Sequence, residues 1–133
     1  TDTKKAGETE ETSMNVFELG EREATGIDFE KGLTYCAGDK DFYMEMVKCF
    51  VNLSVKEELS RYQEQGDYEN YCIRVHGFKN NAYSVGATEL GNLAYEMEKS
   101  TKQGMPAELP KMQERLFEQY DAICETFQRV NNA

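Results

Sequence analysis

Apolar residues recur at steps of three and four through most of the chain, which is the spacing of one face of an α-helix. Asp28 predicts the start of a short helix that runs to about Cys36. Asp39 predicts the start of one long helix that ends at Gly66, with a polar interval at 54–58. The apolar positions of this long helix are Phe42, Tyr43, Met46, Val47, Phe50, Leu53, Leu59 and Tyr62.

The same pattern predicts three more helices. Asp67 can cap the first of them, and Gly86 interrupts it. The next opens at Thr88 and ends near Gly104, and the last begins beside two prolines that a first helical turn tolerates. The apolar stripes are Tyr71, Cys72, Val75, Phe78, Ala82 and Val85; then Leu90, Leu93, Ala94 and Met97; then Leu109, Met112, Leu116, Tyr120, Ile123, Phe127 and Val130.

No segment shows the alternation of a β-strand, so the pattern predicts an all-α protein. The connections at 37–39, 65–67 and 86–88 are short, which favours antiparallel neighbours. The expected architecture over residues 27–133 is therefore an antiparallel up-down four-helix bundle with a short extra N-terminal helix.

Residues 1–26 differ from the rest of the chain. They hold seven acidic and three basic residues, and their only apolar patch surrounds Phe17 and Leu19. Such a segment buries too little surface to offset the entropy of ordering it, so we interpret it as an acidic linker or tail with at most one short docking contact. This tail, and a first residue that is not Met, favour an excised domain or a processed chain, and the choice between a free-standing protein and a domain of a larger protein stays open.

Composition excludes several classes of partner. The chain has 25 acidic and 15 basic residues, a net charge of −10, which argues against binding to nucleic acid or an anionic membrane surface. No apolar run approaches the roughly 20 residues of a membrane span, and no signal peptide is visible, so we expect a cytoplasmic protein. The four cysteines form no Cys-x-x-Cys pair, which predicts reduced, mostly buried thiols and no metal site.

The motifs of common catalytic sites are missing. The glycines form neither a dinucleotide fingerprint nor a phosphate loop, and no nucleophile elbow or EF-hand loop can be aligned. We therefore expect no ATPase or autokinase activity and no cofactor of the protein's own.

One constellation surrounds the only histidine, His76, on the third predicted helix, which is the second of the long ones. Lys79 and Asn80 lie three and four residues further on, and therefore on the same face. Tyr83 shares this flank, and Gly77 has no side chain to crowd the ring, at a cost of roughly 1 kcal/mol to the helix. A neutral imidazole nitrogen is a good nucleophile near neutral pH, and a lysine one turn away can pair with phosphoryl oxygens. The patch suits phosphoryl transfer to and from His76.

The surrounding residues carry a family resemblance. The motif His-x-Phe-Lys-x-x-Ala-x-x-Val-Gly-Ala begins at His76, and Leu-Gly-Asn-Leu-Ala-Tyr-Glu-Met-Glu follows it. Residues 27–130 thereby resemble the histidine-containing phosphotransfer (HPt) domain of bacterial two-component phosphorelays. The resemblance implies that His76 is the phosphoacceptor, that Lys79 steadies the phosphoryl group, and that Glu98 faces the histidine helix. Asn80 departs from the pattern, since the family usually has a small residue there.

The resemblance also implies partners. They are response-regulator receiver domains and an upstream histidine kinase, with Mg²⁺ supplied by the receiver and the protein itself a monomer. Gly77, Asn80 and Tyr83 are the expected docking or second-layer positions. The chain differs from the dimerisation helix of sensor kinases, because Gly77 rather than an acidic residue follows the histidine. It differs from the phosphoacceptor domain of chemotaxis kinases at Ala87, where an aromatic residue is usual.

Two other functions stay open at this point. One is an HPt-like bundle that docks or inhibits a receiver domain without being phosphorylated. The other is a plain helical adaptor, in which the Tyr and Met residues are ordinary core and surface.

Overall fold

The computed structural model describes residues 27–104 and 107–132, and every regular element in this part of the chain is a helix. The predicted all-α class is confirmed. The predicted tail at 1–26, with Phe17 and Leu19, lies outside the described residues. The helices are α2 (Phe29–Tyr35), α3 (Lys40–Val51), α4 (Val55–Gln65), α5 (Tyr68–Ser84), α6 (Thr88–Lys102) and α7 (Leu109–Asn132).

Three aspartates start helices as their positions in the sequence predict. The carboxylates of Asp28, Asp39 and Asp67 each accept a hydrogen bond from the backbone N–H three residues later, at 3.0, 3.0 and 3.2 Å. Each bond satisfies a donor that the first helical turn leaves unpaired. Gly66 ends α4 with a left-handed backbone, φ +68°, which glycine adopts without steric cost.

The prediction of one continuous helix from Asp39 to Gly66 is wrong, because the helix is interrupted between the end of α3 and the start of α4. The Asn52 side chain donates to the carbonyl of Lys48 at 2.8 Å and competes with the helical bond there. The hydroxyl of Tyr120 on α7 donates to the carbonyl of Phe50 at 2.6 Å. A distant side chain therefore adds a short hydrogen bond to a carbonyl whose backbone bond from the N–H of Leu53 is 3.4 Å long.

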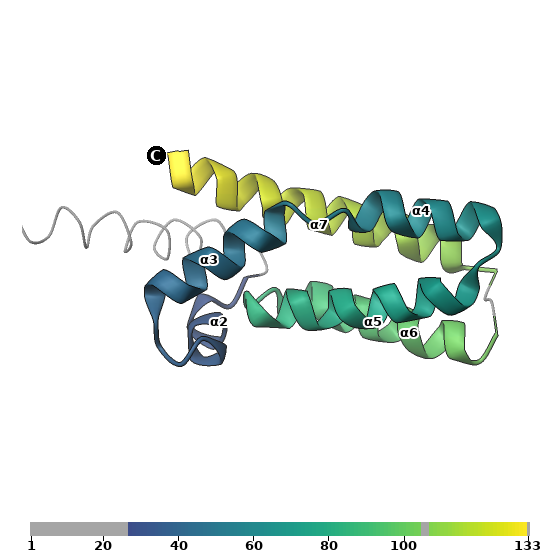
Figure 1. Cartoon of the computed structure of the whole chain (residues 1–133), viewed down its shortest axis with the longest axis horizontal. Coiled ribbons are helices and arrows are strands. Elements are labelled where there is room, and N and C mark those ends of the chain that lie inside the picture. Colours follow the sequence, from purple (N-terminus) through teal and green to yellow (C-terminus); the bar gives the residue numbers. More distant parts are fainter. Residues whose placement is uncertain (1–26, 105–106, 133) are drawn as a thin grey trace, which may run out of the picture.

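Helices α4 to α7 lie lengthwise, with α2 and α3 at one end of the molecule (Figure 1). Helix α5 contacts α4 and α6, and α7 contacts α6 and α3. Polar bridges also join α4 to α7, through Gln63 and Gln113 at 2.9 Å and through Lys56 and Asp121 at 2.8 Å. The interface between α5 and α6 is the most extensive, and it positions the site described below.

Aromatic rings fill the core where α3, α5 and α7 meet. Phe50 stacks on Phe78 with centroids 5.9 Å apart, and Tyr120 meets Phe50 edge-on at 5.2 Å. Most residues of the predicted stripes are buried, but Phe42 is 51% exposed. The buried residues of these stripes are Tyr43, Val47, Phe50, Leu59, Tyr71, Val75, Phe78, Ala82, Val85, Leu90, Ala94, Met97, Leu109, Leu116, Tyr120, Ile123 and Phe127.

A tight junction fixes α2 against the turn between α5 and α6. The backbone N–H of Asp28 donates to the carbonyl of Gly86 at 2.7 Å, and the Tyr43 hydroxyl donates to the carbonyl of Val85 at 2.8 Å. Gly86 has φ +84°, and a Cβ there would overlap the carbonyl of Asp28. The turn at the end of the histidine helix therefore requires glycine.

All four cysteines are free thiols, as predicted, but they are less buried than predicted. Cys36 is buried, Cys72 and Cys124 are partly buried, and Cys49 is exposed. Cys49 falls on the outer face of α3, because the buried positions of that helix are Tyr43, Val47 and Phe50. None of the helices in the described ranges is long and apolar enough to cross a membrane.

Candidate functional site

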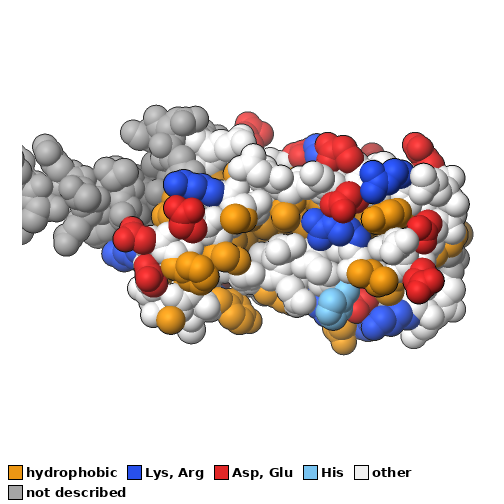
Figure 2. All heavy atoms as spheres, in the orientation of Figure 1, with side chains coloured by type: hydrophobic (Ala, Val, Ile, Leu, Met, Phe, Trp, Pro, Cys, Tyr) orange, Lys and Arg blue, Asp and Glu red, His pale blue; other side chains and the backbone are white. Residues whose placement is uncertain are grey.

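Helix α5 presents His76 and Lys79 because its opposite face is buried. Tyr71, Val75 and Phe78 pack into the core, which turns the residues between them towards the surface. The His76 side chain is 53% exposed and that of Lys79 is 15% exposed. Figure 2 shows the single histidine on the molecular surface, next to both acidic and basic side chains.

Helix α6 brings Glu98 to the histidine. Ala94 and Met97 are fully buried, and Glu98, one residue later, is 3% exposed. At Gly91 a Cβ would overlap the ring of Tyr83, so the two helices approach closely there. The close packing of α6 on α5 therefore buries the acidic side chain of Glu98 among basic groups.

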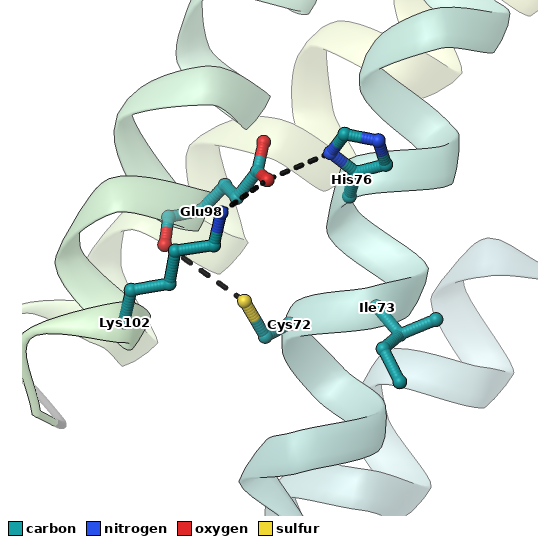
Figure 3. Close-up of a pocket in the computed structure, with 5 residues that line it drawn as sticks. All are labelled: Cys72, Ile73, His76, Glu98 and Lys102. Atoms are coloured by element: carbon teal, nitrogen blue, oxygen red, sulfur yellow. Dashed lines mark hydrogen bonds and ion pairs between the residues drawn. The ribbon is translucent and has the colours of Figure 1, made fainter.

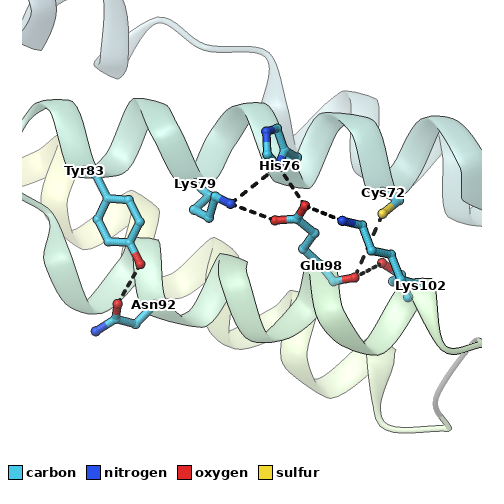
Figure 4. A network of polar contacts seen from close by, with 8 residues as sticks. Cys72, His76, Lys79, Tyr83, Asn92, Glu98 and Lys102 are labelled. Atoms are coloured by element: carbon cyan, nitrogen blue, oxygen red, sulfur yellow. Dashed lines mark hydrogen bonds and ion pairs between the residues drawn. The ribbon is translucent and has the colours of Figure 1, made fainter.

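Glu98 is the centre of a compact ionic cluster (Figure 4). Its Oε2 lies 2.7 Å from Nδ1 of His76 and 3.1 Å from Nζ of Lys102. Its Oε1 accepts from Nζ of Lys79 at 3.0 Å. A buried carboxylate is costly unless it is paired and hydrogen-bonded, and here three donors share that task.

These contacts set the charge of Glu98. Burial by itself would raise the pKa of its carboxyl group, but the hydrogen bonds from Lys79, His76 and Lys102 outweigh burial and lower the pKa to about 2. Glu98 is therefore ionised throughout the physiological range and acts only as an acceptor.

An ionised Glu98 decides which nitrogen of His76 carries the proton. Nδ1 must donate to the carboxylate, so in the neutral ring the lone pair is on Nε2. A protonated Nδ1 cannot accept a hydrogen bond from Lys79. The ammonium of Lys79 therefore only lies near Nδ1, at 3.4 Å, and donates its hydrogen bond to Glu98. The second ring nitrogen points away from Glu98 (Figure 3). The arrangement leaves a nucleophilic nitrogen at an exposed position.

A shallow pocket of about 260 Å³ lies beside the ring and is lined by Cys72, Ile73, His76, Glu98 and Lys102 (Figure 3). Ile73 is 63% exposed and forms an apolar border one turn before the histidine. The backbone carbonyl of Glu98 accepts from the Thr101 hydroxyl at 2.9 Å and faces the Cys72 thiol at 3.9 Å. The pocket therefore has an apolar edge at Ile73 and a cationic edge at Lys102.

The structure brings together three of the predicted site residues, His76, Lys79 and Glu98. It does not bring Tyr83 to them, because its hydroxyl donates to Asn92 at 2.7 Å, away from the cluster (Figure 4). Asn80 is exposed on α5, and its side chain does not line the pocket.

Gly77 differs from the glycines at the turns. A Cβ there would meet only the Arg74 guanidinium, at an ordinary 3.6 Å. No contact within the described residues therefore requires a glycine at this helical position, in contrast to Gly86 and Gly91.

Lys102 is the residue that the sequence analysis missed. Its spacing of four residues after Glu98 is the spacing of an ion pair on one helix face, and this pattern could have identified it. Its side chain is 64% exposed, so it is free to follow a change of charge at the site. Residues 27–104 and 107–132 contain no group of three or more His, Cys, Asp or Glu side chains arranged to hold a metal ion.

Comparison with known proteins adds no relative. No protein-family model matches the chain, and no curated protein or solved structure matches it significantly.

Proposed function

We propose that the protein is a phosphorelay intermediate of two-component signal transduction. His76 accepts a phosphoryl group from a receiver-domain aspartate or a kinase and passes it to another receiver-domain aspartate. The observation that carries this proposal is the hydrogen bond from Nδ1 of His76 to the buried carboxylate of Glu98, which leaves Nε2 as an exposed nucleophile. The HPt resemblance of residues 27–130 agrees with this role.

The transfer step needs little beyond position and charge. The Nε2 lone pair of His76 attacks the phosphorus of an aspartyl phosphate, an N–P bond forms, and the P–O bond breaks with its electron pair leaving on the aspartate. The ring then carries a positive charge, because Nδ1 keeps its proton, and the Glu98 carboxylate accepts that hydrogen bond. In the second transfer another aspartate attacks phosphorus and the N–P electrons return to Nε2.

Charges around His76 suit the arriving group. The phosphoryl group carries nearly two negative charges. Lys79 and Lys102 both form ion pairs with Glu98, next to the His76 ring. Either ammonium can shift from a carboxylate oxygen to a phosphoryl oxygen, since lysine is a flexible point charge. Mg²⁺, which two-component receivers use, would come from the partner and not from this chain.

The finer architecture is part of the same proposal. Short turns join α4 to α5 and α5 to α6, which supports an antiparallel up-down four-helix bundle with α2 as the short extra helix. In this arrangement α3 and α4 together form one of the four long elements. We expect a monomeric, cytoplasmic protein or domain that functions without an ATP site of its own, alone or within a hybrid histidine kinase.

The direct test is to mix the protein with a receiver domain that carries labelled phosphoryl on its aspartate. We expect acid-labile, base-stable label on His76. Binding of the receiver without transfer would contradict the proposal and favour the docking-only bundle. The absence of both binding and transfer would favour a plain helical adaptor.

Lys79→Ala is expected to slow transfer and shorten the lifetime of phosphorylated His76. The lost charge-assisted contact is worth about 1.5–3 kcal/mol when shielded, and the Lys79 side chain is only 15% exposed. Part of the loss should be reproduced in the wild type by high salt, which screens the charge. Rates of transfer measured at two salt concentrations check this, and an unchanged rate and salt dependence would show that Lys79 is only a neighbour.

Gly77→Ala is expected to stabilise the protein while slowing transfer from a receiver. Alanine improves on glycine by up to about 1 kcal/mol in a helix interior, and the new Cβ has room. The glycine is then explained only by a partner that approaches α5 beside His76. Chemical unfolding and receiver transfer rates test this, with phosphorylation by a small phosphoramidate as the control that needs no docking. Faster or unchanged receiver transfer would contradict the docking role.

A further inference from the structure

The ring of Tyr95 lies against the lysine of the site. Tyr95 is on α6, one turn before Glu98, and its centroid is 5.1 Å from Nζ of Lys79. The same ammonium lies 3.0 Å from Oε1 of Glu98 and 3.4 Å from Nδ1 of His76. The Lys79 ammonium is therefore in contact with both an aromatic ring and a carboxylate.

Two different attractions hold this ammonium. The face of an aromatic ring attracts a cation within about 6 Å of its centroid, and the attraction grows as water is removed. A single hydrogen bond to the Glu98 carboxylate restrains the Lys79 ammonium only weakly, because many rotamers of the lysine side chain can form that hydrogen bond. The Tyr95 ring excludes a part of those rotamers and shields Lys79, whose side chain is 15% exposed.

A second lysine uses the same ring without reaching the histidine. Nζ of Lys99 lies 4.6 Å from the Tyr95 centroid and 3.1 Å from Oε1 of Glu96. The Lys99 side chain is 46% exposed, and its ion pair is on the outer surface of α6. Lys99 therefore provides a matched cation on the same ring, outside the cluster around Glu98.

We propose that Tyr95 is a positioning residue that holds the Lys79 ammonium at the His76–Glu98 pair and thereby sets the lifetime of the phosphohistidine. The effect on lifetime rests on the proposed function, whereas the effect on the position of Lys79 does not. Tyr95 does not touch the reacting nitrogen, and it acts only through Lys79. Its ring, not its hydroxyl group, does this, so phenylalanine can replace it.

The experiment compares Tyr95→Phe, which keeps the ring, with Tyr95→Leu, which keeps only apolar bulk. In the whole unphosphorylated chain, NMR of the Lys79 ε-methylene protons is expected to show an upfield ring-current shift in the wild type and Tyr95→Phe. In Tyr95→Leu that shift is expected to disappear. Tyr95 is 44% exposed, so both variants are expected to fold, and a thermal unfolding curve verifies this.

The second measurement is the lifetime of His76 phosphorylated by a small phosphoramidate. Tyr95→Leu is expected to shorten it about two- to fivefold, the range for an exposed to partly shielded cation–π contact. Tyr95→Phe and Lys99→Ala are expected to leave it unchanged. In a Lys79→Ala background, Tyr95→Leu is expected to have no further effect.

Several outcomes would overturn the positioning role. They are a wild-type lifetime in Tyr95→Leu, an equal loss in Tyr95→Phe, or a loss that persists without Lys79. If wild-type His76 takes no label, the proposed function fails, and the NMR comparison still decides the position of Lys79. An unchanged Lys79 shift in Tyr95→Leu would then refute the contact itself.

Discussion

His76→Gln is expected to abolish phosphoryl transfer completely and to leave the helices folded. Glutamine can still donate to Glu98 through its amide, but an amide nitrogen has no lone pair available for attack on phosphorus. Because the His76 side chain is 53% exposed and the glutamine amide can replace the Nδ1–H donor, we expect the free energy of unfolding to change by no more than about 1.5 kcal/mol. Label transferred from a phosphorylated receiver and a chemical unfolding curve measure the two effects.

The composition makes this result decisive. His76 is the only histidine of the chain, so no second imidazole can take the label. Asn92→Ala is a suitable control, since it removes the partner of Tyr83 without touching the Glu98 cluster. Acid-labile label that remains on the Gln variant would refute the assignment of His76.

Glu98→Gln is expected to lower both transfer and stability at neutral pH. The variant keeps the shape of the side chain but removes the charge that holds Nδ1 of His76 and the ammonium of Lys79. Leaving a shielded lysine partly unpaired costs on the order of 1–3 kcal/mol. Nε2 is no longer fixed as the free nitrogen, so the transfer rate is expected to fall at least tenfold.

The pH dependence of stability gives an independent measure of the same cluster. The folded state lowers the Glu98 pKa from 4.5 to about 2, so the carboxylate stabilises the fold above about pH 4.5. That contribution is lost as the pH falls from 4.5 towards 2, because the unfolded chain takes up the proton first. It is on the order of 2 kcal/mol, reduced by solvent screening at the exposed Lys102 and His76.

Urea unfolding at pH 7, 4.5 and 3 tests this dependence. The wild type is expected to lose more stability than Glu98→Gln over this range. Glu96→Gln is the matched control, because the Glu96 side chain is 60% exposed and pairs only with Lys99 among the described ion pairs. Parallel pH profiles for the wild type and Glu98→Gln would contradict the role of the ionised carboxylate.

Local rules explain the parts of the fold that the sequence predicted. A capping aspartate acts on an N–H three residues away, so Asp28, Asp39 and Asp67 could be identified without knowing the tertiary structure. The left-handed turn at Gly66 is equally local. The break between α3 and α4 is different, because the Phe50 carbonyl at the break accepts a hydrogen bond from Tyr120, seventy residues further along the chain.

The candidate site divides in the same way. Periodicity alone put His76 and Lys79 on one face of α5, and the spacing of Glu98 and Lys102 on α6 is also a property of one helix. Periodicity also placed Tyr83 on this flank of α5, but it could not show that the ring packs at Gly91 and that the hydroxyl bonds Asn92 rather than the Glu98 cluster.

An all-helical chain with capped helices and one exposed histidine beside a lysine follows from local sequence rules alone. The contact between Glu98 and Nδ1 of His76 does not follow from such rules, since it requires the packing of α5 on α6. The same packing lowers the Glu98 pKa and places Tyr95 against Lys79. Position along one helix follows from 3.6 residues per turn, whereas a contact between two helices depends on side chains that are far apart in the chain.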